Sequence, residues 1–429
     1  MSGSQQKQNH LIPIIMMMAL FAMISFVTGL STPMGVIVKE QFGASNAMSQ
    51  LGIFANFIAY AIMGIPSGLM IRKYGYRTTA LCAVAVGFVG VLIQFLSGQT
   101  GSFSVYLIGA FVAGFSMCML NAVVNPMLNT LGGGGKKGNA LLQLGGSVNS
   151  LSATIVPVLV GYLIGGALKP SISDASPAMY IAMGIFAVVF VVFFLLQIPE
   201  PHLEPVAKSK EKDKHSPLSF RHFILGAIAI FTYVGVEVGI QSIANIFMTT
   251  EVEKGGLAMD KTIAGSVVGT YWFLMMIGRL TGAAIGSKVS SKVMLSTVTI
   301  TGLILVITAI YTPIATTIGM PVFQSDISFG IVQVPLSIML LILCGLCTSV
   351  MWGGIFNLAV EGLGKYTALA SGIFMVMVCG GGVLPFVQGL VADSIGFLNS
   401  YWVVAAGIAY MLFYALIGSK NVNKNIPVE

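Results

Sequence analysis

The sequence predicts an all-α membrane protein, with twelve membrane-spanning helices in two six-helix halves around a central cavity. Hydrophobic residues make up 56% of the 429 positions and charged residues only 8%, far below the charged fraction of about a quarter in soluble domains. The hydrophobic residues fall in twelve separate runs, and one long charged connection divides these runs into six and six. Many secondary transporters are built from two such halves with a site between them.

Each apolar run can cross a bilayer as a helix, whose backbone satisfies its own hydrogen bonds in lipid. We expect no strands. From the N-terminus onward, the expected spans are 11–38, 47–71, 78–97, 104–128, 139–165, 178–197, 223–249, 263–286, 293–311, 334–358, 369–391 and 401–417.

The charged connection contains the sequence KSKEKDKH and sets the domain boundaries. The expected domains are an N-terminal half at 1–198, a cytoplasmic linker at 199–219 and a C-terminal half at 220–429. The halves are weak copies of each other, since Pro157 and Gly161 of the fifth span recur as Pro385 and Gly389 of the eleventh. Small residues at this spacing also serve helix packing alone, but the span count and the linker favour an internal repeat.

The positions of the basic residues predict the orientation. If the N-terminus is inside, all but four of the 21 Lys and Arg residues lie toward the inner side, and the exceptions are Lys39, Lys169, Lys254 and Lys261. This bias follows the positive-inside rule. We expect a multi-pass protein of the bacterial inner membrane with both termini in the cytoplasm. The net charge of +7 does not indicate a nucleic-acid partner, because the charges occupy short loops between spans.

One acidic residue stands apart from the other thirteen. Glu237 alone lies deep inside a span, where a charge costs roughly 3 kcal/mol on insertion scales. Such a carboxyl faces a wet cavity or carries a proton, so Glu237 is the expected proton carrier of a coupled transporter. The alternative is a carboxyl held by hydrogen bonds between helices.

Amide side chains form stripes at helical spacing in three spans. Gln241 and Asn245 follow Glu237 at i+4 and i+8, and Asn121 and Asn125 repeat this spacing in the fourth span. The fifth span adds Asn139, Gln143, Ser147 and Ser150 at near-helical spacing, with Asn149 beside them. Amides donate and accept hydrogen bonds at once, which suits sugar hydroxyls. The alternative role is hydrogen bonding between helices, worth about 0.6 kcal/mol per bond.

Two tryptophans lie well inside their spans rather than at the interface where most membrane tryptophans gather. Trp272 belongs to the eighth span and Trp352 to the tenth, followed by Asn357. An indole can stack on the apolar face of a sugar ring. These three residues complete the predicted substrate site. Cys344 and Cys347 are spaced like half of a metal site, but no second pair completes it, so we expect no metal.

Several motifs resemble the fucose–galactose–glucose proton symporter family of the major facilitator superfamily. They are NPMLNTLG at 125–132, NS at 149–150, YVGVEV at 233–238, GR at 278–279, GGGVLPFVQGLVAD at 380–393, and the loop GLMIRKYGYR at 68–77. The loop carries Arg72 where an aspartate is usual in the superfamily, and members of this sugar family often lack that aspartate.

The resemblance implies a major facilitator fold working by alternating access, with a central sugar site and proton coupling through Glu237. Arg72, Arg77 and Arg279 are the expected gating residues. Some family features are missing. Thr32 and Asn121 stand where the fucose branch carries acids, and Gly146 where it carries a sugar-binding glutamine. Fucose is therefore not the expected substrate, and coupling rests on Glu237 or on another ion such as sodium.

The sequence therefore predicts a secondary active transporter, acting as a monomer without an organic cofactor, that imports a neutral mono- or small oligosaccharide with protons. A uniporter or exporter of sugars or drugs with the same fold is the nearest alternative. A symporter of a sugar acid such as sialic acid would require a buried cation, for which Arg279 is the one candidate inside a span. A non-transporting sensor would require an output domain, and an enzyme would require paired acids or histidines at a membrane face.

Overall fold

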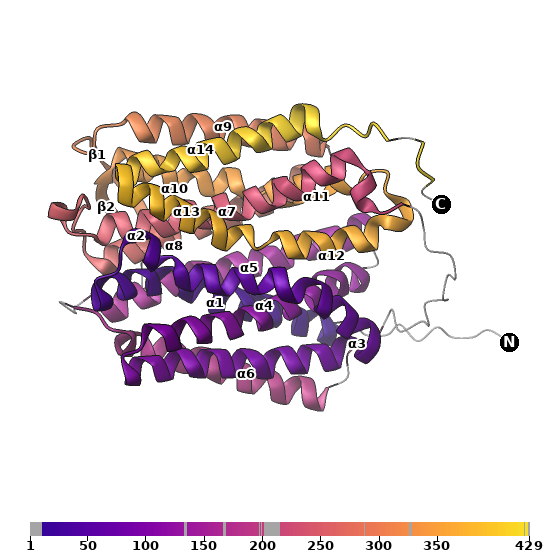
Figure 1. The fold of residues 1–429 in the computed structure, drawn as a ribbon, viewed down its shortest axis with the longest axis horizontal. Coiled ribbons are helices and arrows are strands. Elements are labelled where there is room, and N and C mark those ends of the chain that lie inside the picture. Colours follow the sequence, from indigo (N-terminus) through magenta and orange to yellow (C-terminus); the bar gives the residue numbers. More distant parts are fainter. Residues whose placement is uncertain are drawn as a thin grey trace.

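The computed structural model describes residues 11–427 except 133–134, 166–168, 197, 199, 201–214, 287, 325, 327 and 424. Two bundles of nearly parallel helices lie side by side, the N-terminal half from α1 to α6 and the C-terminal half from α7 to α14 (Figure 1). This confirms the predicted fold class. Most of the predicted linker, 201–214, lies outside the described residues.

The N-terminal half contains five long helices, of which α3 holds two spans. Its helices are α1 (Leu11–Phe42), α2 (Asn46–Ser49), α3 (Leu51–Thr100), α4 (Phe103–Leu131), α5 (Gly135–Ile164) and α6 (Ser176–Leu195), with a 3₁₀ turn η1 (Ile172–Ala175) before α6. Among the described residues, eleven helical segments are long and apolar enough to cross a membrane. Counting both spans of α3, the twelve predicted spans are present.

Gly75 separates the two spans of α3. Its backbone is not helical, with φ 83° and ψ 171°, a conformation that favours glycine. A Cβ at this position would lie 2.9 Å from both carboxylate oxygens of Glu200. These oxygens accept hydrogen bonds from the backbone N–H groups of Tyr76 (2.7 Å) and Arg77 (2.9 Å). The start of the third span is thus capped by an acid that follows α6.

The C-terminal half begins beyond the linker, after a 3₁₀ turn η2 (Pro217–Ser219). Its elements are α7 (Arg221–Thr249), η3 (Val252–Lys254), α8 (Lys261–Ile285), α9 (Ser291–Tyr311), β1 (Thr317–Phe323), β2 (Phe329–Pro335), α10 (Leu336–Thr348), α11 (Met351–Val360), η4 (Gly364–Tyr366), α12 (Thr367–Met377), α13 (Gly380–Ile395), α14 (Phe397–Phe413) and the π-helical turn η5 (Tyr414–Gly418). The tenth span is divided into α10 and α11, and the eleventh into α12 and α13.

The expectation of no strands is wrong for the connection between α9 and α10. Strands β1 and β2 pair antiparallel, with Thr317 opposite Pro335 and Phe323 opposite Phe329. The hairpin docks on α8, because the N–H of Phe323 donates to the Thr270 hydroxyl (3.0 Å) and the Phe323 and Phe329 rings pack on Phe273. Pro321 interrupts the strand-like sequence, which is why composition alone did not reveal it.

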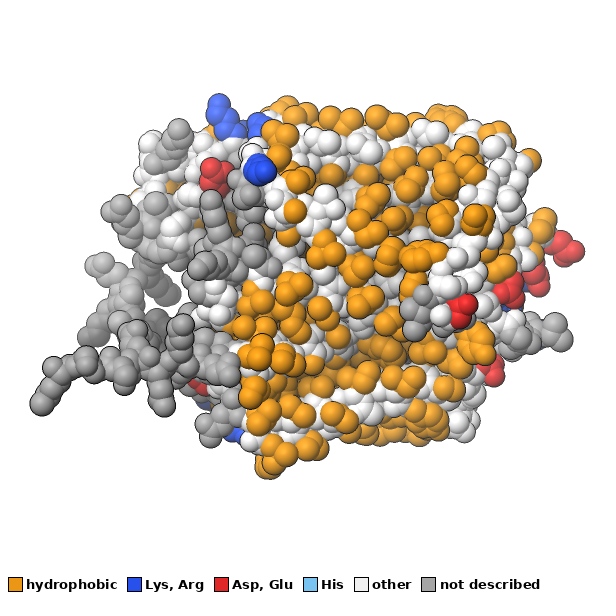
Figure 2. Space-filling model, turned by 180° about the vertical axis from the view of Figure 1, so that it is seen from behind, with side chains coloured by type: hydrophobic (Ala, Val, Ile, Leu, Met, Phe, Trp, Pro, Cys, Tyr) orange, Lys and Arg blue, Asp and Glu red, His pale blue; other side chains and the backbone are white. Residues whose placement is uncertain are grey.

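The two ends of the molecule differ. We call the end that carries β1 and β2 the hairpin end, and the opposite end, where α1 begins and α14 finishes, the terminal end (Figure 1). The four basic residues predicted to lie outside, Lys39, Lys169, Lys254 and Lys261, are all at the hairpin end, where α1, α5 and α7 finish and α8 begins. On the face drawn in Figure 2, hydrophobic side chains form a broad band and charged ones lie toward the ends.

Candidate functional site

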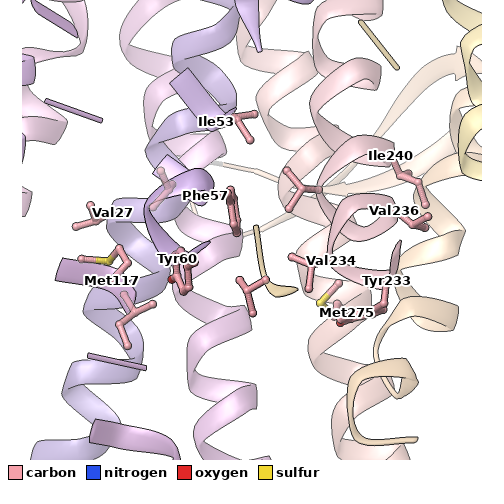
Figure 3. Packing of buried hydrophobic residues seen from close by; sticks show 14 of the residues in the cluster. Val27, Ile53, Phe57, Tyr60, Met117, Tyr233, Val234, Val236, Ile240 and Met275 are labelled. Atoms are coloured by element: carbon pink, nitrogen blue, oxygen red, sulfur yellow. The ribbon is translucent and has the colours of Figure 1, made fainter. Parts of the chain in front are cut away.

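A cavity of about 680 Å³ lies between the two halves, within the range of small-molecule sites. Helices α1, α3, α4 and α5 line it from the N-terminal half, and α7, α8, α11 and α12 from the C-terminal half. Figure 3 shows Phe57 and Tyr60 of α3 on one side and Tyr233 and Val234 of α7 on the other. The lining includes the polar or amphipathic side chains of Ser25, Thr28, Thr32, Tyr60, Asn121, Asn125, Gln143, Asn149, Tyr233, Glu237, Gln241, Trp272, Arg279, Ser349, Trp352 and Asn357.

Helix α7 carries the polar face predicted from sequence. It contains no proline, and most of its residues are buried by its neighbours. Gly235 and Gly239 let α13 approach, since a Cβ at these positions would lie 2.4 Å from Leu384 and 2.6 Å from Gln388. Tyr233, Glu237 and Gln241, each four residues apart, face the cavity. Asn245, one turn further, is not among the lining residues described, although it was predicted to belong to the site.

Glu237 forms an ion pair that sequence reasoning missed. Arg279 Nη2 of α8 lies 3.5 Å from Glu237 Oε1, and the two side chains are only 15% and 12% exposed. Arg279 Nη1 donates to the Gly146 carbonyl oxygen (2.8 Å) and the Ser150 hydroxyl (2.9 Å) of α5, in the other half. Glu237 is the only acid and Arg279 the only base among the described lining residues, so their charges cancel within the cavity.

Tyrosines surround this pair. The Tyr271 hydroxyl donates to the Glu237 backbone oxygen (3.1 Å). The buried Tyr233 hydroxyl has no partner with hydrogen-bond geometry, but it is close enough to Glu237 and Arg279 to interact with both. YVGVEV places Tyr233 one helical turn before Glu237, so a search for polar groups at i−4 would have found it.

Amides of the N-terminal half form a second polar wall. Asn121 Nδ2 donates to the Tyr60 hydroxyl (3.0 Å) and Asn125 Nδ2 to the Asn121 backbone oxygen (2.9 Å). Asn149 Nδ2 donates to the Phe21 backbone oxygen (3.0 Å), which ties α5 to α1. These amide N–H groups are already engaged within the protein. Asn121 Oδ1 also accepts a long hydrogen bond from Asn125 Nδ2 (3.5 Å), but an amide oxygen has two lone pairs and can still accept from a ligand hydroxyl.

The cavity ends toward the hairpin end at a contact between the halves. Gln241 Nε2 of α7 donates to Thr32 Oγ1 of α1 (3.0 Å). Gln241 Oε1 and Thr28 Oγ1 are buried without a partner, an unfavourable state unless a ligand or water binds there. This contact explains why Asn245 lies outside the site, since it is one turn beyond the closure.

The predicted aromatic residues lie on the C-terminal wall. Trp352 packs on Tyr233, with ring centroids 6.1 Å apart, and Trp272 packs on Tyr271 at 5.6 Å. Both indoles are partly exposed to the cavity. Asn357 is exposed near the end of α11 and donates weakly to Ser291 Oγ (3.4 Å), so it lies where the cavity approaches the terminal end.

Two of the predicted gating residues do not join the halves. Arg77 donates from Nε and Nη2 to the carbonyl oxygens of Phe193 and Phe194, both in the N-terminal half, and Arg72 is exposed. Arg279 alone of the three contacts both halves. Arg72 and Arg77 lie on either side of the Gly75 break, which packs against Glu200 after α6, and their gating role stays a prediction.

The hairpin end of the cavity is sealed by further contacts. Both Asp393 carboxylate oxygens accept backbone N–H groups of α2, from Asn46 (2.8 Å) and Ala47 (3.0 Å). Lys39 Nζ donates to Asn46 Oδ1 (2.5 Å) and Thr250 Oγ1 (2.8 Å), and it lies 5.1 Å from the Phe397 ring centroid. Residues of α1, α2, α7, α13 and α14 therefore hold the halves together at this end.

Two helical halves that enclose a central cavity closed at one end are the architecture of many secondary transporters. The family model of the Major Facilitator Superfamily matches residues 15–384. The chain therefore belongs to the Major Facilitator Superfamily, as its motifs predicted, and it is a membrane transporter rather than an enzyme.

Relatives cover nearly the whole chain. A glucose/galactose transporter of Brucella abortus is 27% identical over 424 residues, 97% of each chain. An L-fucose-proton symporter of Escherichia coli is 22% identical over 415 residues, 91% of this chain and 89% of its own. Among solved structures, the transporter FucP in an outward conformation matches 96% of this chain and 100% of its own, with a TM-score of 0.69 and 20% identity, which supports the fold.

Proposed function

We propose that the chain imports a neutral mono- or small oligosaccharide together with protons, by alternating access to the central cavity. The observation that carries this proposal is the paired charge at Glu237 and Arg279 within a lining that is otherwise uncharged among its described residues. A transporter of this kind needs a group that binds and releases a proton beside a site for uncharged hydroxyls.

The lining favours a sugar without a charge. The acceptor oxygens of Asn121 and Asn149 and the unpartnered Gln241 Oε1 suit hydroxyl donors. The Trp352 ring offers an apolar surface for one face of a pyranose. A sugar acid would need a free cation, whereas Arg279 already has Glu237 and two oxygens of α5 as partners. The named sugars of the relatives agree with this class of substrate.

Two observations support proton coupling: the position of Glu237 in the cavity and the similarity of the chain to a proton symporter. Glu237 is the one described acid of the cavity, and burial away from water opposes its charged form unless Arg279 compensates. The Escherichia coli relative is named a proton symporter. A sodium ion as the coupling ion, uniport and export are the other outcomes that the experiment below separates.

The hairpin end would face outward and the terminal end the cytoplasm of a bacterium, in keeping with the positive-inside rule. The structure would then be closed on the outside. All described lining residues of the cavity come from one chain, which supports a monomer as the transporting unit.

The test is sugar uptake into proteoliposomes, with and without an inward proton gradient, for wild type and Glu237→Gln. A panel of neutral hexoses, an amino sugar and sialic acid serves as substrate. Glu253→Gln is the matched control, because Glu253 is an exposed acid at the hairpin end. We expect wild type and control to concentrate one neutral sugar only with the gradient, and Glu237→Gln to equilibrate that sugar without concentrating it.

Other results would contradict parts of the proposal. Accumulation by Glu237→Gln would exclude Glu237 as the proton carrier. Accumulation driven by a sodium gradient alone would show that sodium, not the proton, is the coupling ion. Transport of sialic acid in preference to hexoses would show that the substrate is a sugar acid rather than a neutral sugar.

A further inference from the structure

Arg279 is shared between a carboxylate of its own half and two oxygens of the other half. Its contacts to α5, at 2.8 Å to the Gly146 oxygen and 2.9 Å to Ser150 Oγ, are shorter than its 3.5 Å contact to Glu237. Two short hydrogen bonds to one guanidinium nitrogen fix its position more tightly than one long ion pair. The N-terminal half therefore determines where the guanidinium lies.

We infer that Ser150, together with the Gly146 carbonyl, is a positioning group that sets Arg279 against Glu237 only in the conformation closed at the hairpin end. Ser150 is fully buried and is not among the described residues that line the cavity, although it belongs to the NS motif at 149–150. This inference rests on the proposed function, because it says how proton binding at Glu237 becomes linked to the movement of the halves.

The charged groups and their anchors belong to different halves of the molecule. Glu237 and Arg279 both lie in the C-terminal half, so a rigid movement of the halves would leave their separation unchanged. The two α5 oxygens belong to the N-terminal half and move away when α5 separates from α8. Arg279 then loses both anchors and can turn toward water, which weakens its interaction with Glu237.

The charge state of Glu237 follows from this movement. With the guanidinium held beside it in a largely buried site, the carboxylate form is stabilised, since charges interact more strongly away from water. The cavity of this conformation reaches Asn357 near the terminal end. The proton would therefore leave toward the cytoplasm when Ser150 and Gly146 bring Arg279 into place, and return when the halves separate at the hairpin end.

Few other titratable groups face Glu237 in the described structure. Tyr233 lies one turn away on α7, and Tyr271 and Arg279 come from α8. Cys344 of α10 interacts with Tyr271, and Tyr401 of α14 interacts with Cys344. Helices α1 and α13 carry acidic or basic side chains only near the hairpin end, at Lys39, Glu40 and Asp393. Arg279 is thus the one permanent charge whose position can change the protonation of Glu237.

Ser150→Ala tests the inference, with Ser152→Ala as the matched control. Ser152 lies on the same helix, but its hydroxyl donates to the Ala22 oxygen within the N-terminal half (2.8 Å). Proteoliposomes report three quantities: steady-state sugar accumulation under a proton gradient, sugar exchange without a gradient, and the number of protons that enter per sugar. A role in packing alone would lower accumulation and exchange together.

We expect Ser150→Ala to keep exchange within about twofold of wild type while accumulation falls by roughly tenfold or more, the scale of one hydrogen bond to a charged group. The number of protons per sugar should fall as well. Ser152→Ala should change neither the accumulation nor the number of protons per sugar. In a Glu237→Gln background, Ser150→Ala should have no further effect, because residues that act through one another are not additive.

Two results would overturn the inference while leaving the proposed function intact. One is an unchanged number of protons per sugar in Ser150→Ala when wild type shows proton-driven accumulation. The other is an equal loss of accumulation and exchange in Ser150→Ala. If wild type itself shows no proton-driven accumulation, the proposed function and this inference both fail.

Discussion

Two of the interfaces between the halves are related by the predicted internal repeat. At one interface α5 packs on α8, and at the other α13 packs on α2 and α3. The repeated Pro-x-x-x-Gly step lies in both. A Cβ on Gly161 of α5 would be 2.8 Å from the Lys261 oxygen, and a Cβ on Gly389 of α13 would be 2.8 Å from Ala47 Cα. In both interfaces glycine brings backbone against backbone at the hairpin end.

The interfaces differ in where they place charge. The α5–α8 interface contains the largely buried Arg279, while its helix end is capped from within one half, by Asp260 on the N–H groups of Thr262 and Ile263. The α13 interface has aromatic packing at depth, between Phe54 and Phe386, and its charged cap, Asp393 on α2, joins the two halves. Under the proposed function, the α5–α8 interface responds to a proton through Arg279 and Glu237, and the α13 interface seals the hairpin end.

The largest expected effect comes from replacing the glycine that brings backbone against backbone in each of the two interfaces. Gly161→Val and Gly389→Val each add a branched side chain where backbone lies in the way, which costs about 1 to 3 kcal/mol in a packed core. The closed conformation should become inaccessible, so proton-driven uptake should fall about tenfold or more. Uptake in proteoliposomes measures this, with thermal stability measured in parallel.

Gly184→Val is the control for these variants, because a Cβ at Gly184 of α6 meets nothing within 4 Å. Normal uptake by either interface variant would show that its glycine is not needed for closure. A large loss of thermal stability in Gly161→Val or Gly389→Val would assign the effect to folding instead.

A smaller effect should distinguish the two helix caps. Asp393→Ala removes a cap that exists only while the halves are closed at the hairpin end, whereas Asp260→Ala removes one that persists in every conformation. Loss of a cap costs about 1 kcal/mol, so the closed population should fall about fivefold relative to the open one in Asp393→Ala only.

Labelling with a membrane-impermeant thiol reagent would measure this population. The reporter is Ile53→Cys, a buried lining residue on the hairpin side of the cavity, in a background in which the five native cysteines are replaced. Faster labelling is expected with Asp393→Ala and an unchanged rate with Asp260→Ala. Equal rates in the two variants would mean that the Asp393 cap does not hold the halves together.

The sequence predicted the spans, the internal repeat and the polar face of α7 because lipid imposes length, apolar composition and helical period on each span alone. It did not predict the pairing of Glu237 with Arg279, which lie 42 positions apart on different helices. The helical period also predicted which face of α7 carries Asn245, but not that Asn245 lies beyond the end of the cavity. The cavity ends at the contact between Gln241 and Thr32, which depends on how α1 packs against α7. Contacts between helices decide such features, and no single span contains them.

The smallest expected effect concerns an exposed pair beside the Asp393 cap. Glu251 and Lys254 form a salt bridge of 2.9 Å at the hairpin end, within one half. Their contact lowers the pKa of Glu251 below its ordinary value, through the hydrogen bond and the charge of Lys254, and raises the pKa of Lys254.

A lowered carboxyl pKa contributes stability that is present above the ordinary value, about 4.3, and is lost only as the pH falls through the lowered value. The pair therefore stays charged between about pH 5.5 and 8, where transport would be measured. Glu251→Gln should leave the pH profile of uptake unchanged in this range, as expected for an exposed salt bridge. A shifted profile in this variant would mean that proton sensing extends to the surface of the hairpin end, and the contrast between a proton-responsive α5–α8 interface and a sealing α13 interface would no longer hold.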